Sequence, residues 1–378
     1  MGPLQLSSVR NPREAGMDRD RLSLIDRILE KEIEAGSIPG AVVLIARKGK
    51  IVKHQAYGQA MEEPTRREMT TDTIFDLASL TKVVVTVPLA LLLTEHGAWR
   101  LEDPITRFLP PLKWGRGVSI HHLLTHTAGL PPWAALFSLA KNREEVLELL
   151  TSERWPVATP ICAPGERVIY SDLGYIILGL AIEKITGKDL AALGREWIFS
   201  PLQMQDTMFN PPESLATRIA PTEDDPKRGG VLVGTVHDEN AWALGGVSGH
   251  AGLFATANDL AIYAQMLLNG GHYGNKRVLS SRSVELMVSP QTEGLNERRG
   301  LGWLLQGEST VTAGDLLSEL AFGHTGFTGT SLWIDPRNDL IVALLTNRVH
   351  PSRERGKGEI SRIRALINDI SVGAIVDE

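Results

Sequence analysis

The chain has 378 residues, of which 43% are hydrophobic and 22% are charged, and its formal net charge is −6 at pH 7. This composition is typical of a globular protein that is long enough to bury a large core. The net negative charge, with no extended basic block, argues against nucleic acid as the main partner. A single cysteine, Cys162, excludes an intrachain disulfide.

Residues 1–21 lack the apolar run of a secretory signal. The longest apolar run, residues 83–93, is too short to span a membrane and is interrupted by Thr86 and Pro88. We therefore expect a cytoplasmic protein with no integral membrane segment. The alternative is that a leader segment has been removed from the chain.

The beginning of the chain predicts one helix and a β-hairpin. Apolar side chains recur at helical spacing over residues 22–33. Residues 41–46 and 51–57 are strand-like runs, and the polar residues 47–50 between them form the predicted turn.

Residues 71–269 mostly predict helices that are separated by loops. Helices are expected at residues 118–131, 144–150, 172–186 and 258–268. The run after Lys82 predicts a buried helix, because it is apolar on every side. Residues 211–240 predict mainly turns.

The last quarter of the chain returns to strands and ends in a helix. Strands are expected at residues 301–305, 319–324, 329–334 and 340–345, and a helix is expected at residues 359–370. A turn at residues 335–339 joins the last two strands into a hairpin.

This order of elements predicts an α/β (α+β) fold. We expect an antiparallel β-sheet that is built from both chain ends and flanked by helices, with an inserted, mostly helical lobe. Residues 1–378 would form a single catalytic domain. Its sheet lobe would comprise residues 1–70 and 295–378, its helical lobe would comprise residues 71–294, and a catalytic cleft would lie between them.

Ser79 and Lys82 stand three residues apart at the start of the predicted buried helix, so their side chains share one face. A hydroxyl beside an amine at a helix start can act as a nucleophile and its base. The spacing alone is weak evidence, because about one such pair is expected by chance in a chain of this length. Ser138 and Lys141 indeed repeat it.

Three short motifs in a fixed order give the spacing its meaning. Ser79 and Lys82 follow the first strand pair, Tyr170-Ser171-Asp172 stands at a helix start, and His324-Thr325-Gly326 lies on the last strands. With the supporting stretches 122–130 and 249–257, the chain resembles the serine β-lactamase and penicillin-binding-protein superfamily. The resemblance is to the branch of class C β-lactamases, D-alanyl-D-alanine carboxypeptidases and family VIII esterases, and it covers nearly the whole chain.

Similar motifs occur elsewhere in the chain, but their position argues against them. Tyr273-Gly274-Asn275 lies in a glycine-rich turn, and His250-Ala251-Gly252 follows no predicted strand. The pair Ser138 and Lys141 stands too close to Tyr170 and is not preceded by a strand pair. Order therefore favours Ser79 as the nucleophile.

The resemblance implies a serine hydrolase that needs no metal or cofactor. Ser79 would form an acyl-serine intermediate, while Lys82 and Tyr170 would share the proton transfers. The backbone N–H groups of Ser79 and Phe327 would form the oxyanion hole. The implied substrate-binding residues are Asp172, His324, Thr325, Gly326 and Phe327.

Two residues depart from the family pattern. Asp172 stands where the family usually has asparagine, and an ionised carboxylate cannot donate a hydrogen bond to a substrate amide. If Asp172 lies near Lys82, its charge favours protonated lysine and moves the base role toward Tyr170. His324 replaces the more familiar lysine, so carboxylate binding is expected to weaken as the pH rises past about 6.5.

The expected partner is a small-molecule ester, amide or D-alanyl peptide, and the oligomeric state is left open. β-Lactamase activity ranks third among the activities because of Asp172. A penicillin-binding or regulatory protein that is acylated without turnover is the alternative from another class. A metal site built from His237, Asp238, Glu239 and His250 is a weaker alternative, because their spacing matches no helical metal motif.

Overall fold

A computed structural model describes residues 2–110, 112, 115–140, 142–151, 160–307 and 312–377. Its largest element is an eight-stranded sheet, in which seven strands follow the order β1-β3-β2-β15-β14-β13-β12 and β4 pairs with β3. The strands in this order are β1 (Ser7–Ser8), β3 (Lys50–Met61), β2 (Gly40–Arg47), β15 (Leu340–Thr346), β14 (Ser331–Asp335), β13 (Phe322–Thr325) and β12 (Leu304–Leu305), with β4 at Arg67–Glu68.

The sheet joins the two ends of the chain. β2 pairs antiparallel with β3 on one side and with β15 on the other. The β2–β3 turn has positive φ angles at Lys48 and Gly49, as the twist of a tight hairpin requires. The predicted hairpin of β14 and β15 is also present. The expected fold class, a mostly antiparallel sheet built from both chain ends and flanked by helices, is therefore confirmed.

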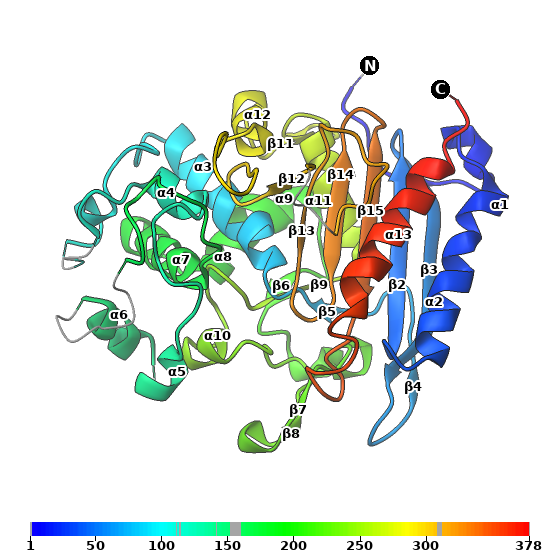
Figure 1. Ribbon diagram of the computed structural model, residues 1–378, viewed down its shortest axis with the longest axis horizontal. Coiled ribbons are helices and arrows are strands. Elements are labelled where there is room, and N and C mark those ends of the chain that lie inside the picture. The colour runs from blue at the N-terminus through cyan, green and yellow to red at the C-terminus, as the bar shows by residue number, and fades with distance from the viewer. Residues whose placement is uncertain are drawn as a thin grey trace.

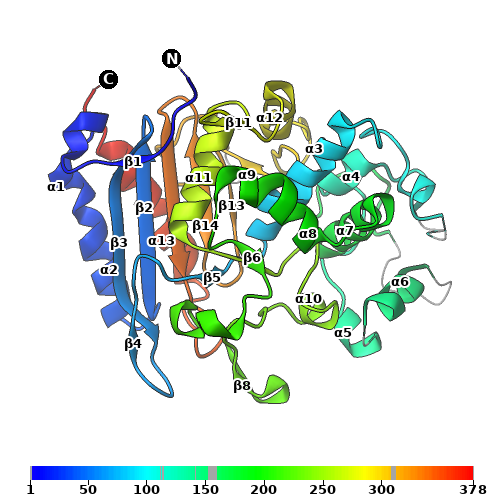
Figure 2. The same cartoon turned by 180° about the vertical axis from the view of Figure 1, so that it is seen from behind.

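Helices cover both faces of the sheet. As a result, every residue of β2 and β15 is buried. Alternate β2 side chains, such as Val43, pack with α1 (Arg19–Leu22), α2 (Leu24–Glu34) and α13 (Glu359–Gly373). The intervening side chains, such as Leu44, pack on the opposite face with α11 (Ala257–Leu268). Figure 1 shows α2 and α13 in front of the strands, and Figure 2, which is seen from behind, shows α11 in front of the opposite face.

Most of the remaining helices lie beyond the β12–β13 edge of the sheet (Figure 1). The full set of remaining α-helices is α3 (Val87–Glu95), α4 (Ile120–Leu124), α5 (Leu136–Leu139), α6 (Arg143–Thr151), α7 (Asp172–Thr186), α8 (Leu190–Gly194), α9 (Ser200–Leu202), α10 (Glu239–Ala243) and α12 (Ser281–Val288). The division of the chain into lobes at residues 70 and 295 stays a prediction. Among the described residues, no helix has both the length and the apolar character needed to cross a bilayer.

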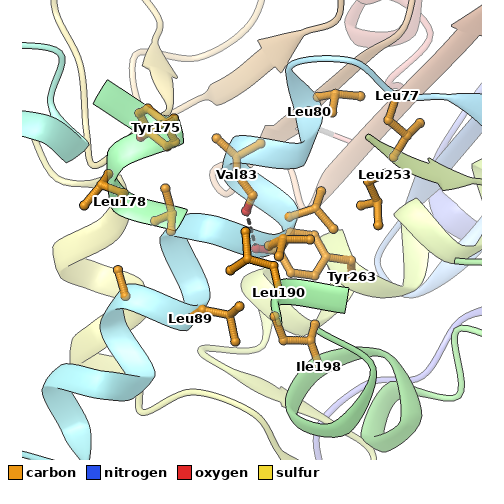
Figure 3. Packing of buried hydrophobic residues seen from close by; sticks show 14 of the residues in the cluster. Leu77, Leu80, Val83, Leu89, Tyr175, Leu178, Leu190, Ile198, Leu253 and Tyr263 are labelled. Carbon is orange, nitrogen blue, oxygen red and sulfur yellow. Dashed lines mark hydrogen bonds between the residues drawn. The ribbon is translucent and has the colours of Figure 1, made fainter. Parts of the chain in front are cut away.

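The predicted buried helix lies at the centre of the larger core. It starts with a π-helical stretch, Lys82–Thr86, and continues as α3. In Figure 3, Leu80 and Val83 lie in a cluster with Tyr175 of α7 and Tyr263 of α11. The Tyr263 hydroxyl donates to the backbone oxygen of Val83 at 2.6 Å. The segment that follows Ser79 is thus fixed by close packing on all sides.

Two predicted elements are shorter than expected. The helix predicted over residues 118–131 covers only α4, because His126 has φ of 59° and Gly129 has φ of 73°, which end helical geometry. The strand predicted at residues 301–305 covers only β12, and Gly302 with φ of 79° precedes it. In contrast, α7 has the predicted bounds of residues 172–186.

Candidate active site

A cleft of about 630 Å³ brings most of the predicted site residues together. Its lining includes Ser79, Tyr170, Asp172, His324, Thr325, Gly326 and Phe327. Lys82, the remaining predicted residue, is buried and in direct contact with Ser79. Residues from three distant parts of the sequence therefore meet at one site.

The backbone just before Ser79 makes a sharp turn. β5 (Phe75–Asp76) leads into Ala78, whose φ of 46° lies in the left-handed region that non-glycine residues seldom adopt. The Asp76 carboxylate compensates by accepting a hydrogen bond from the Ala78 N–H at 2.8 Å. Strain of this kind persists where surrounding contacts determine the backbone, and here it places Ser79 at the cleft surface.

The loop that follows Gly326 is tied to the same turn. The Thr328 hydroxyl donates to the backbone oxygen of Asp76 at 2.7 Å, and the Thr330 hydroxyl donates to that of Leu77 at 3.1 Å. Within the described residues, the backbone N–H groups of Ser79 and Phe327 have no hydrogen-bond acceptor. Two donors on segments that are cross-linked in this way can bind an oxyanion.

Lys82 is surrounded by three acceptors. Its Nζ donates to Ser79 Oγ at 3.0 Å and to the backbone oxygen of His250 at 3.0 Å, and it contacts the Asp172 carboxylate at 2.7 Å. Two of the ammonium protons are thus hydrogen-bonded, and the Asp172 carboxylate balances the positive charge as an ion pair. Burial alone would lower the pKa of Lys82, but the neighbouring Asp172 and Tyr170 raise it overall. The lysine is therefore a cation at neutral pH.

Tyr170 lies between two cations. Lys82 Nζ is 5.0 Å from the centre of its ring, and the Arg299 guanidinium carbon is 5.3 Å from it. Both cations therefore lie within the distance at which a cation interacts with an aromatic ring. The His126 ring packs against the Tyr170 ring, with 4.5 Å between the two ring centres. His126 Nδ1 accepts a hydrogen bond from the Ser171 N–H at 3.0 Å. These contacts fix the tyrosine at the cleft.

His324 is buried, with 2% of its surface exposed. Its Nδ1 donates to the backbone oxygen of Thr325 at 2.8 Å, since that carbonyl can only accept. Burial, together with the positive charges of Arg299 and Lys82, lowers the pKa of His324 well below 6.5. The expectation that His324 carries a charge in mildly acid solution is therefore wrong, because the sequence does not reveal its burial.

Substrate binding should consequently be insensitive to the titration of His324. We expect KM for a substrate with a free carboxylate, such as a D-alanyl peptide, to stay constant between pH 6 and 8. The pKa of a neutral, buried histidine lies below this window, so its charge does not change there. The measurement is KM against pH for the peptide, with an uncharged ester as the control. A KM that rises tenfold per pH unit above pH 6.5 for the peptide alone would contradict this.

The four residues of the alternative metal site have other partners. His237 Nε2 contacts Glu223 at 3.1 Å, His250 Nε2 contacts Asp238 at 2.8 Å, and Glu239 pairs with Arg353 at 2.6 Å. Across the described part of the chain, no group of three or more His, Cys, Asp or Glu side chains is arranged to bind an ion. These side chains instead fix the wall of the cleft.

The other look-alike motifs lie away from the cleft. The Tyr273 hydroxyl accepts a hydrogen bond from the Leu6 N–H at 3.1 Å. Ser138 is exposed on α5, and its hydroxyl donates to the backbone oxygen of Ala135 at 2.7 Å. Its predicted partner Lys141 lies outside the described residues.

Three residues of the site have no place in the sequence motifs. Arg299 is buried beside Tyr170 and pairs with Glu297 at 2.8 Å. Arg364 of α13 donates to the backbone oxygens of Gly326 and Thr330, both at 2.8 Å, and burial lowers its pKa to about 9. His126 lies in the supporting stretch 122–130, which was the only sequence signal for any of them.

Comparisons with known proteins agree with this architecture. The sequence profile described as Beta-lactamase matches residues 25–366. An N-acetylmuramyl-L-alanine amidase of Bacillus subtilis strain 168 is 34% identical, over 92% of this chain and 86% of the relative. A protein of Escherichia coli strain K12 named "Putative D-alanyl-D-alanine carboxypeptidase" is 33% identical, over 90% of this chain and 85% of the relative.

Solved structures show the same fold. EstCE1, a hydrolase with promiscuous acyltransferase activity, superposes with a TM-score of 0.73 at 24% identity, covering 94% of this chain and 99% of the other. The octameric penicillin-binding protein homologue of Pyrococcus abyssi has a TM-score of 0.73 at 23% identity, covering 94% of this chain and 78% of the other.

Fold and sequence together define a protein of the serine β-lactamase and penicillin-binding-protein superfamily. The chain belongs to the β-lactamase family, and it is a hydrolase of that family.

Proposed function

We propose that this protein is a serine hydrolase that cleaves esters, amides or D-alanyl peptides through an acyl-serine intermediate. The observation that carries the proposal is the contact of Ser79 Oγ with Lys82 Nζ at 3.0 Å in the cleft that Tyr170 also lines. A hydroxyl on a strained turn, next to a fixed cation and a tyrosine, is suited to nucleophilic attack.

The reaction would proceed in two halves. Ser79 Oγ attacks the substrate carbonyl carbon while its proton passes to the oxygen of Tyr170, which reacts as a phenolate, and the Ser79 and Phe327 N–H groups bind the oxyanion. Tyr170 then returns the proton to the leaving group as the bond to it breaks. In the second half, Tyr170 takes a proton from water, which attacks the acyl-serine carbonyl. Tyr170 then returns this proton to Ser79 Oγ as the ester bond breaks, which releases the acid and restores Ser79.

Lys82 supports this division of roles as a permanent cation. Its ammonium is paired with the Asp172 carboxylate and the pKa of Lys82 is raised, so a protonated Lys82 has no free electron pair with which to accept the serine proton. Its charge lies beside the Tyr170 ring, and its ammonium orients Ser79 Oγ. We therefore assign the base role to Tyr170 and an electrostatic role to Lys82.

The substrate proposal draws on the relatives and on Asp172. The relatives' names refer to an amidase and a D-alanyl-D-alanine carboxypeptidase, which favours amide or peptide bonds. Ester hydrolysis is the alternative of similar weight. β-Lactamase activity ranks below both, because Asp172 is committed to Lys82 and an ionised carboxylate cannot donate to the amide of a penicillin.

A second candidate function is a penicillin-binding or regulatory protein that is acylated without turnover. The ion pair of Lys82 and Asp172 favours it, because a fixed pair at the nucleophile can slow deacylation. Kinetics separate the two candidates. Multiple turnovers of a p-nitrophenyl ester support the enzyme, whereas a stable adduct of one acyl group per chain supports the sensor.

The test of the nucleophile is intact-mass measurement after treatment with a fluorophosphonate. We expect one label per chain in the wild type and none in Ser79→Ala. Ser138→Ala is the matched control, because Ser138 belongs to the other Ser-x-x-Lys sequence but is exposed outside the cleft. This variant should be labelled like the wild type. Labelling that survives in Ser79→Ala would overturn the proposal.

A further inference from the structure

We propose that His250 is a positioning residue, whose imidazole fixes its own backbone carbonyl as the third acceptor of the Lys82 ammonium. The inference rests on the proposed serine hydrolase function. It concerns the segment Ser248 to Leu253, which the predicted catalytic motifs do not include. The carbonyl of His250 accepts from Lys82 Nζ at 3.0 Å.

The imidazole of His250 is bonded at both nitrogens. Only 1% of the residue is exposed. Nε2 lies 2.8 Å from the Asp238 carboxylate, and because a carboxylate only accepts, Nε2 carries a proton. Nδ1 lies 2.8 Å from the Ser248 hydroxyl. A buried ring with two short contacts on opposite sides cannot rotate, so the attached backbone is held in one orientation.

The backbone on both sides of His250 is pinned to the helix that carries Lys82. The Gly249 carbonyl accepts from the Thr86 hydroxyl at 2.6 Å, and the Leu253 N–H donates to the Thr81 hydroxyl at 3.1 Å. Gly249 also lies so close to α7 that a Cβ atom at this position would be 2.1 Å from the backbone oxygen of Tyr175. The backbone is thus held at Gly249 and at Leu253, and the His250 imidazole holds the residue between them through its side chain.

Asp238 connects this anchor to the cleft. It caps α10 by accepting from the Ala241 N–H at 2.7 Å, and it lines the same cleft as Ser79. Burial would raise the pKa of Asp238, but the contact with His250 Nε2, the hydrogen bond from the Ala241 N–H and the charge of Lys82 lower it overall. Asp238 is thus an anion that α10 holds in place. Asp238 in turn holds the His250 imidazole, and the backbone carbonyl of His250 holds Lys82.

Loss of this anchor should act on the chemical step. If the His250 carbonyl moves, Lys82 keeps Asp172 but can turn away from Ser79, so the nucleophile is no longer aligned. Misalignment of a reacting group by about 1 Å can cost about 100-fold in rate. Substrate binding should change little, because Phe327 and Gly326 stay bonded to their own neighbours.

The experiment compares two replacements of His250 by steady-state kinetics with a p-nitrophenyl ester. In His250→Leu both ring contacts are lost, and kcat should fall by up to about 100-fold with KM within about twofold. In His250→Gln the amide can donate to Asp238 and accept from Ser248, so most of kcat should return. Rates are normalised to the fraction of chains that a fluorophosphonate labels, so misfolded protein does not count.

His350→Leu is the matched control. His350 is fully buried and also bonded at both nitrogens, to the Glu62 N–H at 3.2 Å and the Thr222 oxygen at 2.9 Å, but it does not line the cleft. Its loss should reduce stability and leave the normalised kcat unchanged. If His250→Leu does not fold, Ser248→Ala provides a milder test, with an expected partial loss of kcat.

Three results would overturn the inference: equal kcat in His250→Gln and His250→Leu, a loss confined to KM, or an unchanged normalised kcat in Ser248→Ala. Each of these leaves the labelling of Ser79 untouched. Failure of the inference is therefore distinguishable from failure of the proposed function, which the Ser79→Ala variant tests by itself.

Discussion

Replacement of Tyr170 by phenylalanine is expected to lower kcat for ester hydrolysis by about 10²- to 10⁴-fold, the usual contribution of a general base. The substitution removes the oxygen to which we assign the Ser79 proton, because Lys82 is a cation paired with Asp172. The ring remains, so its packing against His126 is preserved. The expected loss lies in kcat and in the acylation rate, with little change in KM.

Stopped-flow measurement of the acylation burst tests this expectation directly. Tyr273→Phe is the matched control, because that hydroxyl is bonded to the Leu6 N–H outside the cleft and should be dispensable for catalysis. Lys82→Met completes the comparison. If Tyr170→Phe keeps most of its activity while Lys82→Met loses all of it, the lysine is the base and the assignment is wrong.

Replacement of Asp172 by asparagine is expected to change both reactivity and stability. The asparagine can donate to a substrate amide, which should raise the acylation rate with penicillins by about tenfold, equivalent to one hydrogen bond of about 1.4 kcal/mol. The substitution also removes the negative charge that compensates for burying the Lys82 ammonium. Breaking a buried ion pair commonly lowers the free energy of unfolding by about 3–5 kcal/mol. Because asparagine keeps one side-chain oxygen, we expect a loss near the lower end of this range.

The stability of the Asp172→Asn variant should also depend on pH in a new way. Without the charge of Asp172, only Tyr170 opposes the effect of burial, so the pKa of Lys82 should fall in the folded variant and the unfolded chain should bind more protons than the folded one. The free energy of unfolding should then rise with pH from neutral toward pH 10. In the wild type the pKa of Lys82 is raised, and no such rise is expected because the lysine is protonated in both states.

Denaturant unfolding at several pH values measures this slope, and intact mass after penicillin treatment measures the reactivity. Asp189→Asn is the control, because Asp189 also stands at a helix start, where it accepts from the Ala192 N–H at 2.6 Å away from the cleft. Unchanged penicillin reactivity in Asp172→Asn would show that Asp172 does not discriminate between substrates.

The fold could be predicted from the sequence where local chemistry determines structure. α7 has its predicted bounds because Ser171 caps its start by accepting from the Gly174 N–H, and Gly187 ends it in the left-handed conformation with φ of 69°. The helix predicted over residues 118–131 failed for the opposite reason. Its end depends on His126, whose unusual backbone is fixed by contacts with Tyr170 and Ser171 from another part of the chain.

The same distinction applies to the site. The order of the motifs was enough to predict that Ser79, Tyr170 and His324 would line one cleft. The charge state of His324 was predicted wrongly, because it depends on burial and on the proximity of Arg299 and Lys82. Arg299 itself has no motif, since a single arginine near a turn has no periodicity or spacing that marks it.

The position of β15 beside β2 also determines when the protein can become reactive during synthesis. Thr346 pairs with Ala41, and Phe327 supplies a donor opposite Ser79, so both pairings join residues that are made far apart in time. Contacts between such distant residues form slowly and only after the later segment has left the ribosome. Under the proposed function, a nascent chain that already exposes Ser79 would lack the oxyanion hole, and acylation would wait until the last strands have joined the sheet.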